Sequence, residues 1–359
     1  MTARTTIRSR RAVAALMVLT LLLAAGCGSG EASPSPAGSP GSAGSPAASI
    51  VPPATGTPLS TVGPTATVAP ASATPVSFTS GTVVAWGDNS AGQTSVPKGL
   101  AGVVAVSAGD MFSVALKSDG TVVAWGAADS GQTKVPAAAT GIKAISAGSS
   151  HVIALKSNGT VIGWGANTYG QAQSAAKLVD VVEISAGGDH NLALKSDGTV
   201  VAWGSDASGE TETPKGLKDV VHVSAGYDYS LALLKDGTVV AWGDKFVTDV
   251  PTGVAKVPAG LSGVTAIAAG YYHNLVRKQD GTVVSWGQKQ DGQTTVPAGL
   301  VGVTALAAGG NFSLALKTDG TVVAWGGNDA GQRTLPSGLS NVIAIDAGGS
   351  HALAIVGQP

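Results

Sequence analysis

The chain has 359 residues, of which 12% are charged, 51 are glycine and one is cysteine, and its formal net charge at pH 7 is −1. This length suits one large domain with flanking segments, and a single cysteine excludes an intrachain disulfide. Residues 78–359 hold 17 basic and 21 acidic residues, so the basic patch of a nucleic-acid-binding protein is not expected.

The N-terminal segment predicts export. Four arginines between Arg4 and Arg11 precede an apolar run over 12–25, which is too short to remain as a membrane-spanning helix and is typical of a signal peptide. The stretch Leu23-Ala24-Ala25-Gly26-Cys27 resembles the lipobox of bacterial lipoproteins. That resemblance implies removal of residues 1–26 and acylation of Cys27, the new N-terminus. The pair Arg10-Arg11 also fits a twin-arginine signal, which leaves the export route open.

Residues 27–77 continue from the lipidated cysteine as a linker. From Gly28 onward they are almost entirely Ser, Pro, Ala, Gly, Thr and Val, a composition that buries too little apolar surface to offset the entropy of ordering. The proline content favours a semi-extended tether. The sequence leaves O-glycosylation of this linker undecided.

A fixed repeat organises residues 78–359. The stretch Gly120-Thr121-Val122-Val123-Ala124-Trp125-Gly126 has a copy around every tryptophan. The tryptophans are separated by 39 residues, except for one step of 44. A period of this size indicates a repeat architecture. The seven tryptophans are Trp86, Trp125, Trp164, Trp203, Trp242, Trp286 and Trp325.

Each repeat predicts four short antiparallel strands. In residues 103–141, Asp119-Gly120 is a strong hairpin signal because both residues tolerate positive φ. Pro136 ends the last strand, since proline suits only the ends and edges of a sheet. Four short strands per repeat are typical of a propeller blade. The strands expected here are 103–106, 112–117, 121–125 and 132–135.

The repeat register predicts how the ring closes. The first copy begins at Ser80-Gly81-Thr82 with only the last two strands of a blade, and the last copy ends after the first two strands, with residues 351–356. We therefore expect an all-β, seven-bladed β-propeller of four-stranded blades, in which strands from the two chain ends share one blade. Small residues before each Ala-Gly turn suit strands that line the axis. The longer step reflects an insertion over 244–258, expected in a loop.

The repeat motif resembles a known family. The run Trp86-Gly87-Asp88-Asn89-Ser90-Ala91-Gly92-Gln93, followed by Ala108-Gly109 and the strand 113–116, is similar to the regulator of chromosome condensation repeat. The 39-residue form is most similar to secreted bacterial members of the type of β-lactamase inhibitory protein II. The resemblance implies a propeller that binds proteins with one face. The resemblance also suggests guanine-nucleotide exchange as a possible function, because eukaryotic members have this activity. Exchange is incompatible with an exported chain.

One face of the expected propeller varies between copies. Because adjacent strands alternate in direction, the turns after the first strand and the loops after the third strand lie on the same face. This face gathers acidic and aromatic residues, and tyrosine is favoured at interface hot spots. A solvated loop face without a partner is the alternative. The residues expected to contact a partner are Met111, Phe112, Tyr169, Asp189, Tyr227, Asp228, Tyr271, Tyr272, Phe246 and Asn311.

The sequence offers little for catalysis. His151, His190, His273 and His351 share one repeat position with aromatic residues elsewhere, which favours packing or a hydrogen bond within the blade over a ligand or catalytic role. No cysteine lies in the propeller and no zinc motif is present, and no phosphate-binding loop or cofactor motif is found. We expect no metal site, no bound cofactor and no enzymatic activity. Convergent acidic loops leave a glycan-binding or glycan-cleaving module as the alternative.

These observations predict a monomeric, non-catalytic binding module with three segments. They are the signal peptide 1–26, the lipidated linker 27–77 and the propeller 78–359. The expected location is the outer face of the cytoplasmic membrane, at the cell surface or in the periplasm, reached through the lipid anchor. The expected partner is a protein whose identity the sequence leaves open.

Overall fold

A computed structural model describes residues 80–173, 178–245 and 253–357 of the chain. The predicted signal peptide, Cys27, the linker and Phe246 lie outside the described residues. Within the described ranges every regular element is a β-strand, and no helix there is long and apolar enough to cross a membrane. The chain is therefore all-β in this part, as the sequence predicts.

The strands form antiparallel groups of three, here called units. First strands are β2 (Val103–Ala108), β5 (Ile142–Ala147), β8 (Val181–Ala186), β11 (Val220–Ala225), β14 (Val264–Ala269), β17 (Val303–Ala308) and β20 (Val342–Ala347). Second strands are β3 (Phe112–Lys117), β6 (His151–Lys156), β9 (His190–Lys195), β12 (Tyr229–Leu234), β15 (His273–Lys278), β18 (Phe312–Lys317) and β21 (His351–Gly357). Third strands are β4 (Val122–Gly126), β7 (Val161–Gly165), β10 (Val200–Gly204), β13 (Val239–Gly243), β16 (Val283–Gly287), β19 (Val322–Gly326) and β1 (Gly81–Gly87).

The local sequence explains each unit. Val and Ile dominate the strands because branched side chains suit a pleated, buried surface. The second and third strands are joined by the Asp-Gly hairpin: Gly120 has φ of 81°, and the Asp119 carboxylate accepts the backbone N–H of Thr121 at 2.9 Å. This hydrogen bond holds the pKa of Asp119 low, at about 2. The predicted hairpin is confirmed.

The expected fourth strand is wrong, because the units have three strands. The segment 132–135 forms turns instead of pairing. The backbone N–H of Lys134 donates to the Gly131 carbonyl at 3.0 Å, and the side chain of Gln132 accepts the N–H of Ser130 at 2.9 Å. Pro136 offers no N–H. A local bond therefore uses the Lys134 N–H, and the Gln132 carbonyl accepts the Trp164 indole N–H, so both groups are unavailable to a fourth strand.

The two ends of the described chain share one sheet. Strand β1 pairs with β21 over its whole length, from Gly81 opposite Gly357 to Gly87 opposite His351. A single pair, Gly81 with Val103, joins this unit to β2. The result is one six-stranded sheet in the order β20-β21-β1-β2-β3-β4, beside five three-stranded sheets in the described chain.

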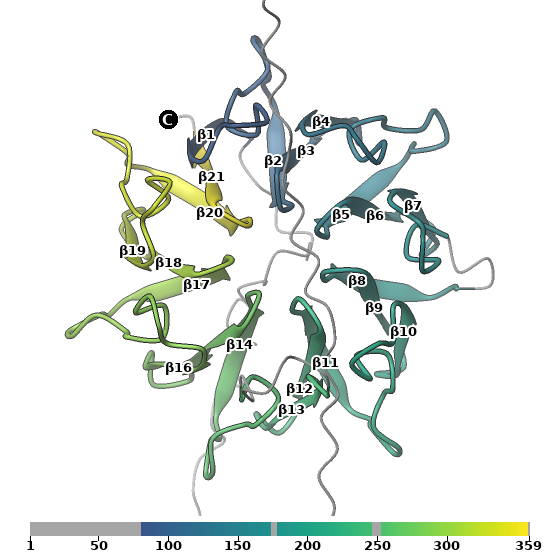
Figure 1. Ribbon diagram of the computed structural model, residues 1–359, viewed down its shortest axis with the longest axis vertical. Helices are drawn as coiled ribbons and strands as arrows, with labels where there is room; N and C mark the ends of the chain where they lie inside the picture. The colour runs from purple at the N-terminus through teal and green to yellow at the C-terminus, as the bar shows by residue number, and fades with distance from the viewer. Residues whose placement is uncertain (1–79, 174–177, 246–252, 358–359) are drawn as a thin grey trace, which may run out of the picture. The chain divides into compact units, whose positions relative to one another are not determined.

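Neighbouring units pack through their first strands. Figure 1 shows these strands innermost in each unit. Contacts run from β2 to β5 and onward in chain order to β20, and β20 also contacts β2. Serine side chains link the inner strands, as where Ser107 Oγ accepts the N–H of Ala147 at 3.0 Å. Likewise, Asp346 Oδ2 accepts the backbone N–H of Ala108 at 2.8 Å.

Tryptophan links the outer parts of neighbouring units. The Trp125 indole donates to the Gln93 carbonyl of the preceding unit at 2.8 Å. Trp86, on β1, makes the same bond to the Gln332 carbonyl at 2.9 Å, which ties the start of the described chain to the loop after β19. These side chains are buried, so each contributes to the hydrophobic core between two units.

Candidate functional site

Two kinds of loop combine into one surface, called the loop face here. It consists of the turns between first and second strands and the loops after third strands. In the first complete unit, Ala127 N–H donates to the Met111 carbonyl at 2.9 Å. In the last, Asp88 N–H donates to the Ser350 carbonyl at 2.9 Å. The same bond recurs in the units between them, which places both loops on one face as predicted.

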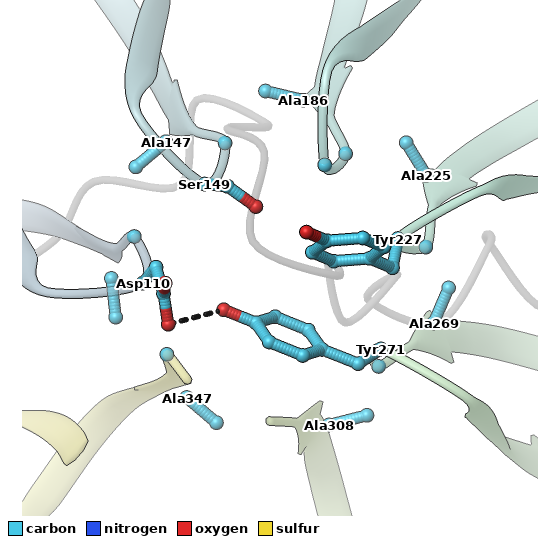
Figure 2. A pocket seen from close by; sticks show the side chains of 18 residues that line it. Asp110, Ala147, Ser149, Ala186, Ala225, Tyr227, Ala269, Tyr271, Ala308 and Ala347 are labelled. Carbon is cyan, nitrogen blue, oxygen red and sulfur yellow. Dashed lines mark hydrogen bonds between the residues drawn. The ribbon is translucent and has the colours of Figure 1, made fainter. Parts of the chain in front are cut away.

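A small recess lies where the turns converge. It has a volume of about 70 Å³ and is lined by the Ala-Gly turns together with Asp110, Ser149, Tyr227 and Tyr271. Figure 2 shows the alanines arranged around it and the two tyrosine rings reaching across it. Glycine is required at these turns because a Cβ at Gly109 would lie 2.1 Å from the Phe112 ring. Small residues thus bring the turns close together.

Three tyrosines form a cluster beside this recess. The ring centroid of Tyr227 lies 5.0 Å from that of Tyr271 and 5.6 Å from that of Tyr272. The Tyr271 hydroxyl donates to Asp110 Oδ1 at 2.7 Å across the recess. Burial and the nearby carboxylates raise the pKa of Tyr272 to about 12 and that of Tyr271 well above its usual range. All three phenols therefore stay protonated and act as neutral donors.

Carboxylates surround the tyrosine cluster. Burial, and then the charges of Glu210, Asp189 and Asp244, raise the pKa of Asp228 to about 6. Asp189 accepts the side-chain N–H of Gln171 at 2.8 Å. Within the described residues no group of three or more His, Cys, Asp or Glu could hold a metal ion. The chemistry on offer is hydrogen bonding, aromatic contact and negative charge.

The structure separates the predicted contact residues into groups. Tyr227, Tyr271, Tyr272, Asp189 and Asp228 come together. Other residues lie on the loop face of different units: Met111 and Tyr169, which are 39% and 55% exposed, and Asn311, which accepts the side-chain N–H of Gln332 at 3.1 Å.

Phe112 requires a correction. Its side chain is fully buried and packs with Val114, Val152 and Trp164, so it contacts no partner. The alternation of Phe with His at this repeat position already signals an internal site. Asp110, Ser149 and Glu210, in turn, were missing from the predicted set.

The histidines at that position are structural, but their bonds cross between units. Each is buried and pairs through Nε2 with the second strand of the next unit. Burial lowers the pKa of His190 to about 3, so the ring stays neutral. The pairs are His151 with Asn191 at 2.8 Å, His190 with Ser230 at 3.0 Å, His273 with Ser313 at 2.9 Å and His351 with Ser113 at 2.9 Å.

His222 is also structural. It lies on β11, and its Nδ1 is 3.1 Å from Glu183 Oε2 on β8 of the neighbouring unit. For the four second-strand histidines, the expected bond within a blade is thus replaced by bonds between units, and His222 also bonds to a neighbouring unit.

Comparison with known proteins agrees with this geometry. Six segments match the regulator of chromosome condensation (RCC1) repeat, at residues 103–132, 142–171, 181–210, 220–244, 264–293 and 303–332. No curated protein matches the chain.

Among solved structures, Prp20p from Saccharomyces cerevisiae is similar with a TM-score of 0.64 and 21% identity, over 77% of this chain and 92% of that one. Human WBSCR16 has a TM-score of 0.61 and 18% identity, over 76% and 98%. The CRINKLY ectodomain of the Arabidopsis thaliana receptor kinase ACR4 has a TM-score of 0.55 and 22% identity, over 70% and 91%. These likenesses show the shared fold.

Proposed function

Since the chain carries six repeats of the RCC1 family, we propose that its loop face is the docking surface of a non-catalytic, protein-binding propeller. The seven units are the blades of one closed ring. The contact of β20 with β2 and the pairing of β1 with β21 support this closure. Closure fixes the turns of all units on one surface.

The tyrosine cluster is the observation that carries the proposal. Three tyrosines beside a recess, held in place by packing and by the bond from Tyr271 to Asp110, present rigid amphipathic surface. Such surface is what interface hot spots use, because little side-chain entropy is lost on binding. Exposed Met111 and Tyr169 extend the apolar contact area to other blades.

Structural neighbours support a protein as the partner. The Prp20p structure was described with its binding properties to Gsp1p and histones, and another structure shows Kap60 bound to yeast RCC1 (Prp20). None of these partners is transferred to this chain. What the neighbours support is the general use of this fold in protein binding.

The N-terminal sequence sets the expected location. We propose that the signal peptide of residues 1–26 is removed and that lipidated Cys27 anchors a monomer to the outer face of the cytoplasmic membrane. A second acyl chain makes such an anchor stable, since each buried CH₂ contributes about 0.8 kcal/mol. The linker up to residue 77 then connects the anchor to the binding domain.

Site-specific photo-crosslinking on intact cells tests the docking surface. A benzophenone amino acid replaces Tyr272 on the loop face in one strain, and Lys117, at the hairpin end of β3, in the matched control. We expect a discrete protein adduct from the first position and none from the second. Equal adducts from both positions, or adducts from the control alone, would refute docking by the loop face.

A further inference from the structure

A glutamine closes most loops of the loop face. After the third strand, its Oε1 accepts the backbone N–H of the residue two positions earlier. The distances are 2.9 Å for Gln93, 2.9 Å for Gln132, 2.8 Å for Gln171, 3.0 Å for Gln293 and 2.9 Å for Gln332. Each of these bonds leaves the Nε2 amide group free to donate elsewhere.

In two of these units that amide satisfies an acceptor on a turn before a second strand. Gln171 Nε2 donates to Asp189 Oδ1 at 2.8 Å, and Gln332 Nε2 donates to Asn311 Oδ1 at 3.1 Å. Asp189 and Asn311 occupy the same repeat position, directly before the second strand. Asp189 belongs to the unit after that of Gln171, so this bond joins two units through a neutral donor and an acceptor, whereas Asn311 belongs to the same unit as Gln332.

One unit breaks this arrangement. Glu210 stands in place of the glutamine, and Asp228 stands at the position of Asp189 in the next unit. Glu210 Oε2 accepts the N–H of Ser208, which keeps the usual backbone bond. Its Oε1 finds no hydrogen-bond partner among the described residues, although the side chain is only 1% exposed. A carboxylate thus stands where Gln171 has an amide, and it lies close to Asp228: a Cβ at Gly243 would be 2.8 Å from the Asp228 carbonyl oxygen and 3.2 Å from Glu210 Cα.

The charge at this position is not compensated within the unit. Among charged groups Glu210 contributes most to raising the pKa of Asp228, followed by Asp189 and Asp244. Lys245, which lies beside Gly209, is already paired with Glu212. A buried negative charge without a counter-charge is unfavourable, and a cation placed between the carboxylates removes that penalty.

We propose that Glu210 and Asp228 form an anchor site for a lysine or arginine side chain of the protein partner, a refinement that rests on the proposed docking function. Asp228 is partly exposed on the loop face, while Glu210 is buried. The flanking rings of Tyr227 and Tyr272 add cation–π attraction. An arginine guanidinium matches this set best, because its planar fork donates to two carboxylates at once.

Glu210→Gln is the sharpest test, because it restores the amide of the other units without adding bulk. The probe is fluorescein-labelled hexa-arginine, and binding to the full chain carrying Cys27→Ser is followed by anisotropy at pH 7.5 and low salt. We expect Glu210→Gln to weaken binding about 10-fold, equivalent to about 1.4 kcal/mol. A melting temperature of Glu210→Gln above that of the unsubstituted chain would show that this variant folds.

Two further variants distinguish binding at this site from a general effect of the protein's net charge. Asp129→Asn removes one charge from an exposed residue of the same face and should weaken binding by less than about 2-fold, as expected of an exposed rim charge. Asp228→Asn should act like Glu210→Gln, since Asn311 shows that the position accepts an amide. Equal losses from Glu210→Gln and Asp129→Asn would overturn the proposal.

Two other outcomes are informative. Thermal stabilisation by Ca²⁺ that Glu210→Gln abolishes would assign the pair to a metal ion and also overturn the proposal. Adducts confined to the loop face in the crosslinking experiment, combined with unchanged hexa-arginine binding, would reject this site while leaving the docking function intact.

Discussion

Deletion of residues 80–87 should abolish cooperative unfolding of the chain. This segment contains β1, which supplies the third strand of the unit formed by β20 and β21. The deletion removes Trp86, which is 7% exposed, and exposes the edge of β21. Loss of a buried tryptophan alone costs about 3–5 kcal/mol. Loss of a whole strand exceeds that figure and approaches the total stability of about 5–15 kcal/mol for a typical domain.

The measurement is urea denaturation followed by tryptophan fluorescence. A matched control deletes residues 62–69, an equally long stretch of the predicted linker, and should leave the midpoint unchanged. A sharp transition at the wild-type midpoint after deletion of 80–87 would show that β1 is dispensable and that the sheet shared by the two ends contributes nothing to the fold.

Acidification from pH 7 to 4.5 should lower the free energy of unfolding by about 5 kcal/mol, through buried histidines that must stay neutral. Burial lowers the pKa of His190 to about 3 and the pKa values of His273 and His351 to about 4. A depressed pKa contributes stability that is present above the unfolded value of about 6.5 and is lost as pH falls. At pH 4.5 each ring then costs about 3 kcal/mol.

Two carboxyl groups act in the opposite direction. Burial raises the pKa of Asp346 and Asp228 to about 6. Their contribution is present below the unfolded value of about 3.9 and is lost as pH rises through 6, so acidification recovers it. At pH 4.5 the contribution of Asp346 offsets about 2 kcal/mol of the stability lost through the histidines. The contribution of Asp228 is smaller because this residue is partly exposed. The histidines outweigh both.

The chain supplies its own control for this effect. Phe312 takes the histidine position opposite Ala352, and both are buried in one cluster. The double variant His273→Phe with Ser313→Ala copies that pair. It should reduce the pH-dependent loss by about 3 kcal/mol in urea titrations at the two pH values. An unchanged pH dependence would show that His273 is not among the groups responsible.

The period and the hairpins made the repeated sheets predictable. Strong turn residues such as Asp119-Gly120 act locally, and the tryptophan spacing is independent of tertiary context. The fourth strand was wrong for a different reason. The segment 132–135 can pair as a strand only if its N–H groups donate to a neighbouring strand. The Lys134 N–H donates to the Gly131 carbonyl instead, and β-propensity does not predict which acceptor an N–H group uses.

The candidate site was only partly predictable from sequence. Exposure separates Met111 from Phe112, yet the two are neighbours in the chain. One missed signal was present: His151, His190 and His273 are each followed 40 residues later by Ser or Asn. Phe112 is followed at the same distance by Val152, with which it packs. Comparing residues 40 positions apart identifies side chains that contact each other between neighbouring units. A search within single repeats overlooks such contacts.

The most direct test of ring closure is a disulfide between the two ends. Thr82 lies opposite Val356 in the β1–β21 register, and adjacent strands bring paired Cβ atoms within disulfide range. The variant combines Thr82→Cys and Val356→Cys with Cys27→Ser, and mild oxidation is followed by mass spectrometry and thermal unfolding. We expect a monomer with one intramolecular disulfide, stabilised by about 3–5 kcal/mol because the bond closes a very long loop. Free thiols or disulfide-linked dimers after oxidation would contradict a ring whose first and last strands lie side by side.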